Sequence, residues 1–143
     1  MQRDSQWWKQ WMMGLARYVA TASKDPSTQV GAVVIDKNRI VRGVGYNGFP
    51  RGVDDSAHRL AEREVKYKFV VHAEANAILN SRGDVRGCTL ITTMHPCSEC
   101  AKLIIQAGII SVACPSPVER WQDDAKLART MLSEAGVGLH EEP

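Results

Sequence analysis

The apolar positions of the first fifty residues follow a helical period and then change to strand-like runs. From Ser5 to Ser23 apolar side chains recur at helical spacing, at Trp8, Met12, Leu15, Val19 and Ala22. Asp25-Pro26 disfavours a longer helix. Two runs rich in β-branched residues follow, Val30–Ile35 and Ile40–Tyr46, separated by a short polar segment. The pattern predicts an amphipathic helix and then a β-hairpin.

Three tryptophans lie near the start of the predicted helix, at Trp7, Trp8 and Trp11. Aromatic residues at helical spacing normally face the core, so we expect these rings to pack inside the domain. A subunit interface is the alternative for one of them.

The second half of the chain alternates between helical and strand patterns. Gly108 and Gly136 follow two of the predicted helices, where glycine commonly ends a helix. The predicted elements are a helix from His72 to Asn80, a strand Cys88–Thr93, a helix that follows Pro96 and runs to Ala107, a strand Ile109–Cys114, a helix Asp123–Ala135 and a strand Val137–His140.

The segment Val53–Phe69, between the two halves, is charged and irregular, and it contains one predicted short helix from His58 to Tyr67. Two interpretations stay open. A long insertion near a functional motif is often a lid or a ligand-binding loop, but its composition fits a solvated connection equally well. A single histidine in such a segment, here His58, is usually a surface residue.

Strands that alternate with helices indicate right-handed crossovers and parallel pairing, while the hairpin adds antiparallel strands to the same sheet. We therefore predict an α/β fold, a three-layer α/β/α sandwich around a mixed five-stranded sheet. The 143 residues, 44% of them apolar, are enough for a single domain over residues 1–143.

The net charge of +2 is close to neutral, and Lys and Arg are scattered among Asp and Glu. This distribution argues against a nucleic-acid partner, which would favour a concentrated basic face. No run of 18 apolar residues and no signal-peptide pattern occurs, so we expect a cytoplasmic protein without a membrane partner. In that compartment disulfides are rare, and Cys88 and Cys114, within apolar runs, are expected to be buried core residues.

The remaining two cysteines are Cys97 and Cys100, which share one face of a helix at their spacing. His72 completes a set of three zinc-type donors. A structural zinc site normally has four protein ligands, whereas a catalytic site keeps one position open. Glu74 lies about 200° around a helix from His72, so it is expected to be a proton shuttle and not a ligand.

His72 precedes the two cysteines by 25 and 28 residues, which is room for one helix, one strand and a turn. Two helices can therefore present their N-termini to one point. The partial positive charge of a helix N-terminus favours thiolate at Cys97 and Cys100. Zinc lowers the pKa of a bound water, and Glu74 can take that proton and return it to a leaving group.

The pattern His-x-Glu followed by Pro-Cys-x-x-Cys is the signature of zinc nucleobase deaminases. Within that superfamily the chain most resembles the deoxycytidylate (dCMP) deaminases. His72–Ile78 and Pro96–Lys102 carry motifs that many deaminases share, whereas Ser23–Ala32 and Gly45–Pro50 are more specific to the dCMP branch.

The resemblance implies a cytidine deaminase-like fold and hydrolysis of dCMP to dUMP and ammonia, which feeds dTTP synthesis. One catalytic Zn²⁺ would be bound by His72, Cys97 and Cys100. Glu74 would protonate N3 of cytosine and then the departing amine.

For the rest of the substrate, the resemblance implies that Asn47 contacts the deoxyribose and that the backbone of Ala73 and the segment before Cys97 hold the base. Ser23 and Lys24 are the candidates for the 5′-phosphate.

Members of this family are often hexamers that dCTP activates and dTTP inhibits, with Mg²⁺. The segment that resembles part of their regulatory site contains Tyr46, Asn47, Gly48, Phe49 and Arg51.

The chain departs from some relatives at two points. It has no tyrosine in Pro115–Val118 to close over the substrate, so Trp121 is the candidate substitute. It also lacks the cysteines of a second, structural zinc site, so we predict one metal.

Other functions share parts of this pattern. A tRNA adenosine, cytidine or guanine deaminase would carry the same metal motif, although near-neutral charge argues against a tRNA substrate. A thioredoxin-like redox pair would use Cys97 and Cys100 but leave His72 and Glu74 without a role. A structural zinc module would need a fourth ligand, which is not evident.

Overall fold

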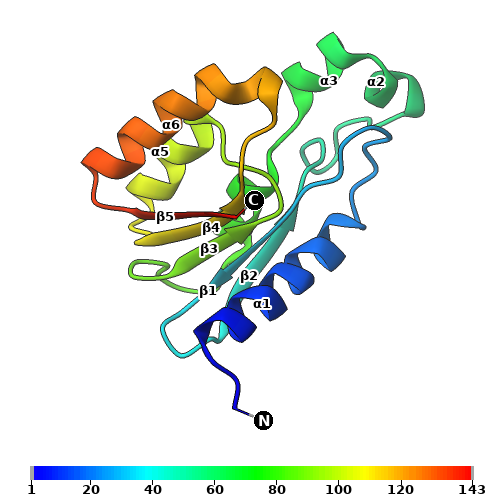
Figure 1. Cartoon of the computed structure of the whole chain (residues 1–143). Helices are drawn as coiled ribbons and strands as arrows, with labels where there is room; N and C mark the ends of the chain where they lie inside the picture. Colours follow the sequence, from blue (N-terminus) through cyan, green and yellow to red (C-terminus); the bar gives the residue numbers. More distant parts are fainter. Residues whose placement is uncertain (1, 143) are drawn as a thin grey trace.

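The computed structural model describes residues 2–142, and a mixed five-stranded sheet forms its middle layer (Figure 1). The spatial order is β2-β1-β3-β4-β5. β1 pairs antiparallel with β2 and β3, whereas β3, β4 and β5 are parallel, which confirms the predicted mixed sheet. The strands are β1 (Gly31–Ile35), β2 (Val41–Tyr46), β3 (Thr89–Thr92), β4 (Ser111–Pro115) and β5 (Gly138–Glu142).

Helix α1 (Ser5–Ala20) covers one face of the sheet (Figure 1). The Asp4 side chain caps it by accepting a hydrogen bond from the Trp7 amide at 2.8 Å. A Cβ on Gly31 would lie 2.1 Å from the Ala16 carbonyl oxygen, so glycine lets the helix approach β1 closely. The core on this face consists of Met12, Met13, Ala16, Val33, Ile91 and Ala113.

Two predictions about α1 were wrong. The helix ends at Ala20 and not at Ser23, because the amide of its C-cap, Thr21, turns back onto the Tyr18 and Val19 carbonyls. Trp11 is 49% exposed, since it lies about 200° around the helix from the buried Met13. Trp7 and Trp8 are half-buried and contact each other edge to face.

The opposite face of the sheet is covered by α4 (Ala73–Asn80), α5 (Ser98–Gln106) and α6 (Gln122–Glu134). The predicted three-layer α/β/α arrangement is therefore confirmed. Cys88 and Cys114 are free thiols in this core, as predicted. Other members of the core are Ala77, Leu90, Ala101, Ile104, Val112, Ala128 and Leu132.

Helix α4 lies unusually close to β2 because of a glycine. A Cβ on Gly45 would lie 2.2 Å from the Ala77 nitrogen and 2.6 Å from the Ala73 carbonyl oxygen. Any larger residue would push the helix away from the strand. Gly45 thus determines the distance between the sheet and the first residues of α4.

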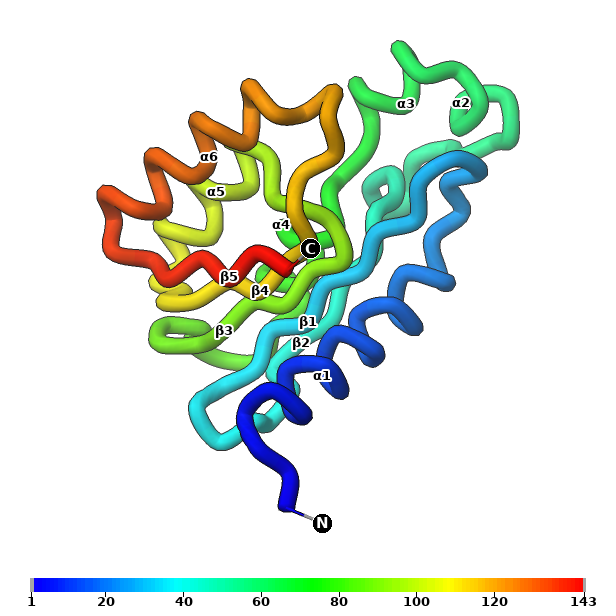
Figure 2. The backbone as a smooth tube through the Cα atoms, in the orientation of Figure 1, coloured from blue at the N-terminus to red at the C-terminus, as the bar shows by residue number. Residues whose placement is uncertain are grey.

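The charged insertion forms two short helices, α2 (Ala57–Ala61) and α3 (Arg63–Phe69), where the sequence predicted one. Glu62, with extended backbone, separates them. A 3₁₀ turn, Glu119–Trp121, leads into α6 and lies beside α3, with the Tyr67 and Trp121 rings 6.4 Å apart (Figure 2). The other predicted elements begin and end within two residues of the observed ones.

Within residues 2–142, none of the helices combines the length and apolar character that crossing a bilayer requires.

Candidate active site

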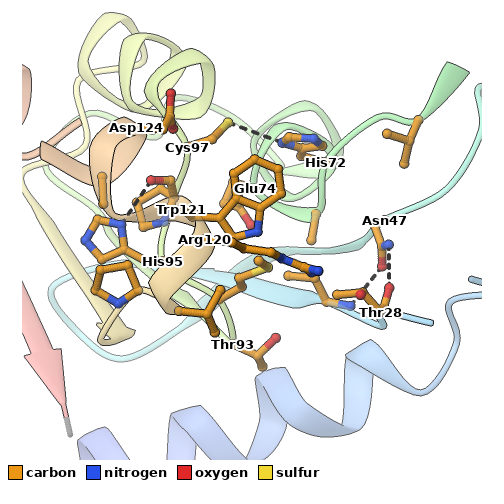
Figure 3. Close-up of a pocket in the computed structure, with 18 of the residues that line it drawn as sticks. Thr28, Asn47, His72, Glu74, Thr93, His95, Cys97, Arg120, Trp121 and Asp124 are labelled. Carbon is orange, nitrogen blue, oxygen red and sulfur yellow. Dashed lines mark hydrogen bonds between the residues drawn. The ribbon is translucent and has the colours of Figure 1, made fainter. Parts of the chain in front are cut away.

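A cavity of about 430 Å³ lies at the carboxyl ends of β3 and β4 (Figure 3). The residues that follow β3, from Thr93 to Ser98, form one wall, and those that follow β4, from Pro115 to Val118, form another. His72, Ala73 and Glu74 enter from the start of α4. In α/β sheets ligands commonly bind outside the carboxyl ends of the strands, and the volume is that of a small-molecule site.

The three predicted metal ligands lie together beside this cavity, and two of them, His72 and Cys97, line it. His72 is the N-cap residue of α4 and Cys97 that of α5, with Cys100 in the first turn of α5. Their donor atoms all lie within 4.8 Å of one another. The helix starts bring two partially positive ends together, which favours anionic sulfur at this point.

The distances within this group fit a zinc ion. His72 Nδ1 lies 3.4 Å from Cys97 Sγ and 3.4 Å from Cys100 Sγ. Bonds of about 2.3 Å to sulfur and about 2.0 Å to nitrogen at tetrahedral angles separate such atoms by roughly 3.5 Å. Cys100 is buried, but His72 is exposed to the cavity. The donor set therefore suits a tetrahedral zinc with its fourth position toward the cavity.

The two thiols differ in their affinity for a proton. The hydrogen bond from the Cys100 thiol, together with the bond between Cys97 and His72, lowers the pKa of Cys97 to about 4. The contact with Cys97 raises the pKa of Cys100, and it also raises the pKa of His72. Because zinc binds thiolates, a zinc ion at this point would displace the proton of Cys100.

Glu74 stands beside this group in the second position of α4, and it is 4% exposed. Burial raises the pKa of its carboxyl. The Thr92 hydroxyl, at the end of β3, donates to Glu74 Oε1 at 3.0 Å and so fixes the carboxyl's orientation. A buried carboxyl with a raised pKa next to a metal-type donor set is a candidate general acid and base.

The outer part of the cavity carries cations and aromatic rings from two distant segments. α3 contributes Arg63 and Tyr67, and the 3₁₀ turn contributes Arg120 and Trp121. The Arg120 guanidinium lies 5.5 Å from the centre of the Trp121 ring. The cavity thus combines a metal-type group inside with positive charge at its mouth.

The chain matches a known enzyme family. A family model described as the cytidine and deoxycytidylate deaminase zinc-binding region matches residues 6–115. The chain belongs to the cytidine and deoxycytidylate deaminase family. It is therefore a hydrolytic deaminase, and the predicted resemblance to the deoxycytidylate deaminases is confirmed.

Three relatives are informative. An uncharacterized deaminase from the luxG 3′ region of Aliivibrio fischeri is 48% identical, over 93% of this chain and 91% of that protein. The human deoxycytidylate deaminase is 43% identical, over 91% of this chain and 76% of that protein. A dCMP deaminase from the cyanophage S-TIM5, solved with dCMP and dUMP, has a TM-score of 0.76 at 28% identity and covers 94% and 96% of the two chains.

Asn47 of the deaminase lies in the cavity wall and is 7% exposed. Its side-chain oxygen accepts a hydrogen bond from the Val30 amide at 2.8 Å, and its nitrogen donates to the Thr28 carbonyl at 2.9 Å. The residue predicted to contact the sugar thus also holds the loop before β1. Ala73, the other predicted substrate contact, is fully buried and lines the cavity.

The structure does not bring Ser23 and Lys24, the phosphate candidates, into the cavity lining. Ser23 is buried and donates to the Asn47 carbonyl at 2.9 Å. Lys24 points to solvent and pairs with Asp55 at 2.9 Å. Other residues of the Ser23–Ala32 motif do line the cavity, namely Asp25, Ser27, Thr28 and Val30.

The segment predicted to be regulatory follows β2 outside the cavity, apart from Asn47. Tyr46 is exposed, the Phe49 ring lies 5.4 Å from the Phe69 ring, and Arg51 donates to Asn80 at 3.1 Å. Gly48 and Val71 exchange backbone hydrogen bonds of 3.1 and 2.7 Å. The segment is thus joined directly to the residue before His72.

Sequence reasoning missed several residues of the site. Lys66 is buried beside the cavity, where its ammonium donates to Asp25 at 3.1 Å and to Ser27 at 2.7 Å. Arg63 and Arg120 gave no signal, because they look like ordinary surface charges in the sequence. Thr92 could have been suspected from its position at the end of a strand next to the Pro-Cys motif.

Proposed function

We propose that this deaminase hydrolyses dCMP to dUMP and ammonia with one zinc ion per chain. The observation that carries the proposal is the cluster of His72, Cys97 and Cys100 next to the buried carboxyl of Glu74, beside a cavity that His72, Glu74 and Cys97 line. Similarity to the human deoxycytidylate deaminase and to the phage enzyme solved with dCMP and dUMP supports a cytosine nucleotide as substrate. The product dUMP supplies dTTP synthesis.

His72, Cys97 and Cys100 are the zinc ligands in this proposal. Zinc supplies a Lewis acid that brings the pKa of water close to neutrality. His72, Cys97 and Cys100 would hold the ion beside the cavity, next to Glu74. The convergence of both cysteines with a histidine also favours metal binding over the redox function of a free Cys-x-x-Cys pair.

Glu74 moves the protons. Water adds to C4 of cytosine while the carboxylate accepts a proton and delivers it to N3. Glu74 then takes the proton of the new C4 hydroxyl and gives it to the exocyclic amine, so the C4–N4 bond breaks, ammonia leaves and the C4 carbonyl of dUMP forms. The raised pKa brings this carboxyl closer to the working pH, which suits a group that must accept and donate in one cycle. The Thr92 hydroxyl donates to Glu74 Oε1 and so keeps this oxygen oriented toward both N3 and the exocyclic amine.

The base and the sugar lie between two walls. The backbone of Ala73 and the residues from Thr93 to Pro96 hold the base, and Asn47 contacts the deoxyribose. Trp121 takes the place of the closing tyrosine, and its edge contact with Tyr67 supports the ring at the mouth.

Arg63 and Arg120 bind the 5′-phosphate. Both line the cavity, and an arginine presents several N–H donors to phosphate oxygens at once. Lys66 is a weaker candidate because its charge is balanced by the buried Asp25. This assignment replaces Ser23 and Lys24, which stand apart from the lining residues.

We also propose that dCTP activates and dTTP, with Mg²⁺, inhibits a cytoplasmic homo-hexamer through Tyr46, Asn47, Gly48, Phe49 and Arg51. The paired backbone bonds between Gly48 and Val71 support this proposal, because a ligand that shifts the segment would also shift the residue next to His72.

The test is the loss of cytosine absorbance with zinc-replete protein and dCMP, dCTP, deoxycytidine or CMP, each with and without dCTP or dTTP plus Mg²⁺. We expect dCMP to be converted fastest, and about one zinc per chain by elemental analysis. Equal conversion of deoxycytidine would contradict phosphate recognition. Turnover only of adenine or guanine compounds would overturn the substrate and leave the metal chemistry.

A further inference from the structure

The N-terminus of α5 lacks an ordinary capping group. An N-cap residue is usually Ser, Thr, Asp or Asn, whose oxygen accepts a free backbone N–H. Here the position is taken by Cys97, whose sulfur accepts from the Cys100 amide at 3.4 Å. Sulfur is a weak acceptor, and in the proposed site it is also a zinc ligand. The turn that carries both cysteines therefore depends on a partner from outside its own helix.

Asp124, in the first turn of α6, is that partner (Figure 3). One carboxylate oxygen accepts the Ser98 amide at 2.9 Å, and the other accepts the Ser98 hydroxyl at 2.7 Å. Ser98 is 9% exposed and lies between the two cysteines in the sequence. Both oxygens of Asp124 thus accept hydrogen bonds from the residue next to Cys97. The negative charge of Asp124 also stabilises a helix N-terminus.

The same part of the chain also forms the mouth of the cavity. Trp121 is the residue just before α6, and the Gln122 side chain donates to the Pro117 carbonyl at 2.9 Å. Asp124 follows within one helical turn. The bonds to Ser98 therefore connect the segment that carries Arg120 and Trp121 to the turn that carries the cysteines.

We infer that Asp124 is a positioning residue, which caps α5 in place of the side chain committed to zinc and so holds Cys97 and Cys100 in ligating geometry. The inference rests on the proposed zinc site. Outer contacts of this kind typically change metal affinity or activity by about 10–100-fold when they are removed. Asp124 does not reach the reacting atoms; it acts through Ser98.

The decisive measurement is the rate at which zinc passes from the loaded protein to a chromogenic chelator. We expect Asp124→Ala to release zinc about 10–100-fold faster than the unchanged protein. Asp123→Ala is the matched control, since it removes an exposed carboxylate from the preceding position. Adding Ser98→Ala to Asp124→Ala should increase the rate of zinc release little further, because Asp124→Ala already removes the acceptor of the Ser98 hydroxyl.

A further variant separates positioning from general destabilisation. Leu132→Ala opens the core under α6 without touching Ser98, so it should lower the melting temperature and leave zinc release slower than in Asp124→Ala. If Asp124→Ala does not fold, Asp124→Asn takes its place. This variant keeps an oxygen acceptor, so it should release zinc faster than Asp123→Asn, but by a smaller factor. Release no faster than in these controls would overturn the inference. If the unchanged protein binds no zinc, the proposed function itself is overturned.

Discussion

The two walls of the cavity are built in different ways. The inner wall contains His72, Glu74 and Cys97, with the buried Cys100 behind them, and these residues stand at the starts of α4 and α5. The mouth wall consists of Arg63, Lys66, Tyr67, Arg120 and Trp121, which come from a short helix and a 3₁₀ turn far apart in the chain. Groups that break bonds need fixed geometry, and regular elements provide it.

The mouth wall is mostly exposed. Arg120 and Trp121 are accessible to a ligand that arrives from solvent. The exception is Lys66, whose buried pair with Asp25 ties α3 to the loop before β1. The inner wall thus stands on the starts of two regular helices, whereas the mouth wall is exposed apart from one buried ion pair.

Replacing the acid and base of the inner wall should have the largest effect. Glu74→Gln keeps the size of the side chain and an oxygen for the Thr92 hydroxyl, but it cannot carry the proton. We expect kcat for dCMP to fall on the order of 10²–10⁴-fold, with zinc content and melting temperature nearly unchanged. Absorbance assays measure kcat, elemental analysis measures the zinc content, and thermal unfolding measures the melting temperature. A variant with normal turnover would remove Glu74 from the mechanism.

Breaking the anchor of the mouth wall should mainly cost stability. Lys66→Met leaves Asp25 buried without its cation, and we expect the free energy of unfolding at pH 7 to fall by about 3–5 kcal/mol. Lys68→Met, an exposed change of the same charge on the same helix, is the control. If urea unfolding gives the same free energy of unfolding for both variants, the buried Lys66–Asp25 pair does not stabilise the fold.

The pH dependence of that loss follows from Asp25. Burial alone would raise its pKa, but the Ser27 and Thr28 amides and Lys66 outweigh this and lower the pKa below the ordinary 3.8. A lowered carboxyl pKa contributes stability above the unfolded value, and this contribution is lost as pH falls through the folded value. The difference between Lys66→Met and the unchanged protein should therefore shrink as the pH falls below about 4.

The phosphate contact should give the smallest of the three effects. We expect Arg120→Ala to raise KM for dCMP roughly tenfold to hundredfold, as one charged hydrogen-bond partner is lost, with deoxycytidine turnover unchanged. Arg86→Ala, at an exposed arginine absent from the cavity lining, is the control. If KM rose equally for dCMP and deoxycytidine, Arg120 would stabilise the structure of the cavity mouth and would not bind the 5′-phosphate.

Much of the inner wall was predictable because its signals are local. The spacing of Cys97 and Cys100 and the strand–turn–helix pattern before them required no knowledge of the rest of the chain. Of the mouth wall, the sequence indicated only Trp121. Lys66 meets Asp25 across 41 positions and Asp124 meets Ser98 across 26, so the pairs appear as unrelated charges in the sequence.

By itself the sequence determined the alternation of helices and strands, the mixed sheet and the family, because hydrophobic period and motif spacing act over a few residues. Only the tertiary structure decided which side of α1 is buried, how the insertion divides at Glu62 and which charges reach the cavity. These features depend on packing between elements that lie far apart along the chain, and no local pattern encodes such distances.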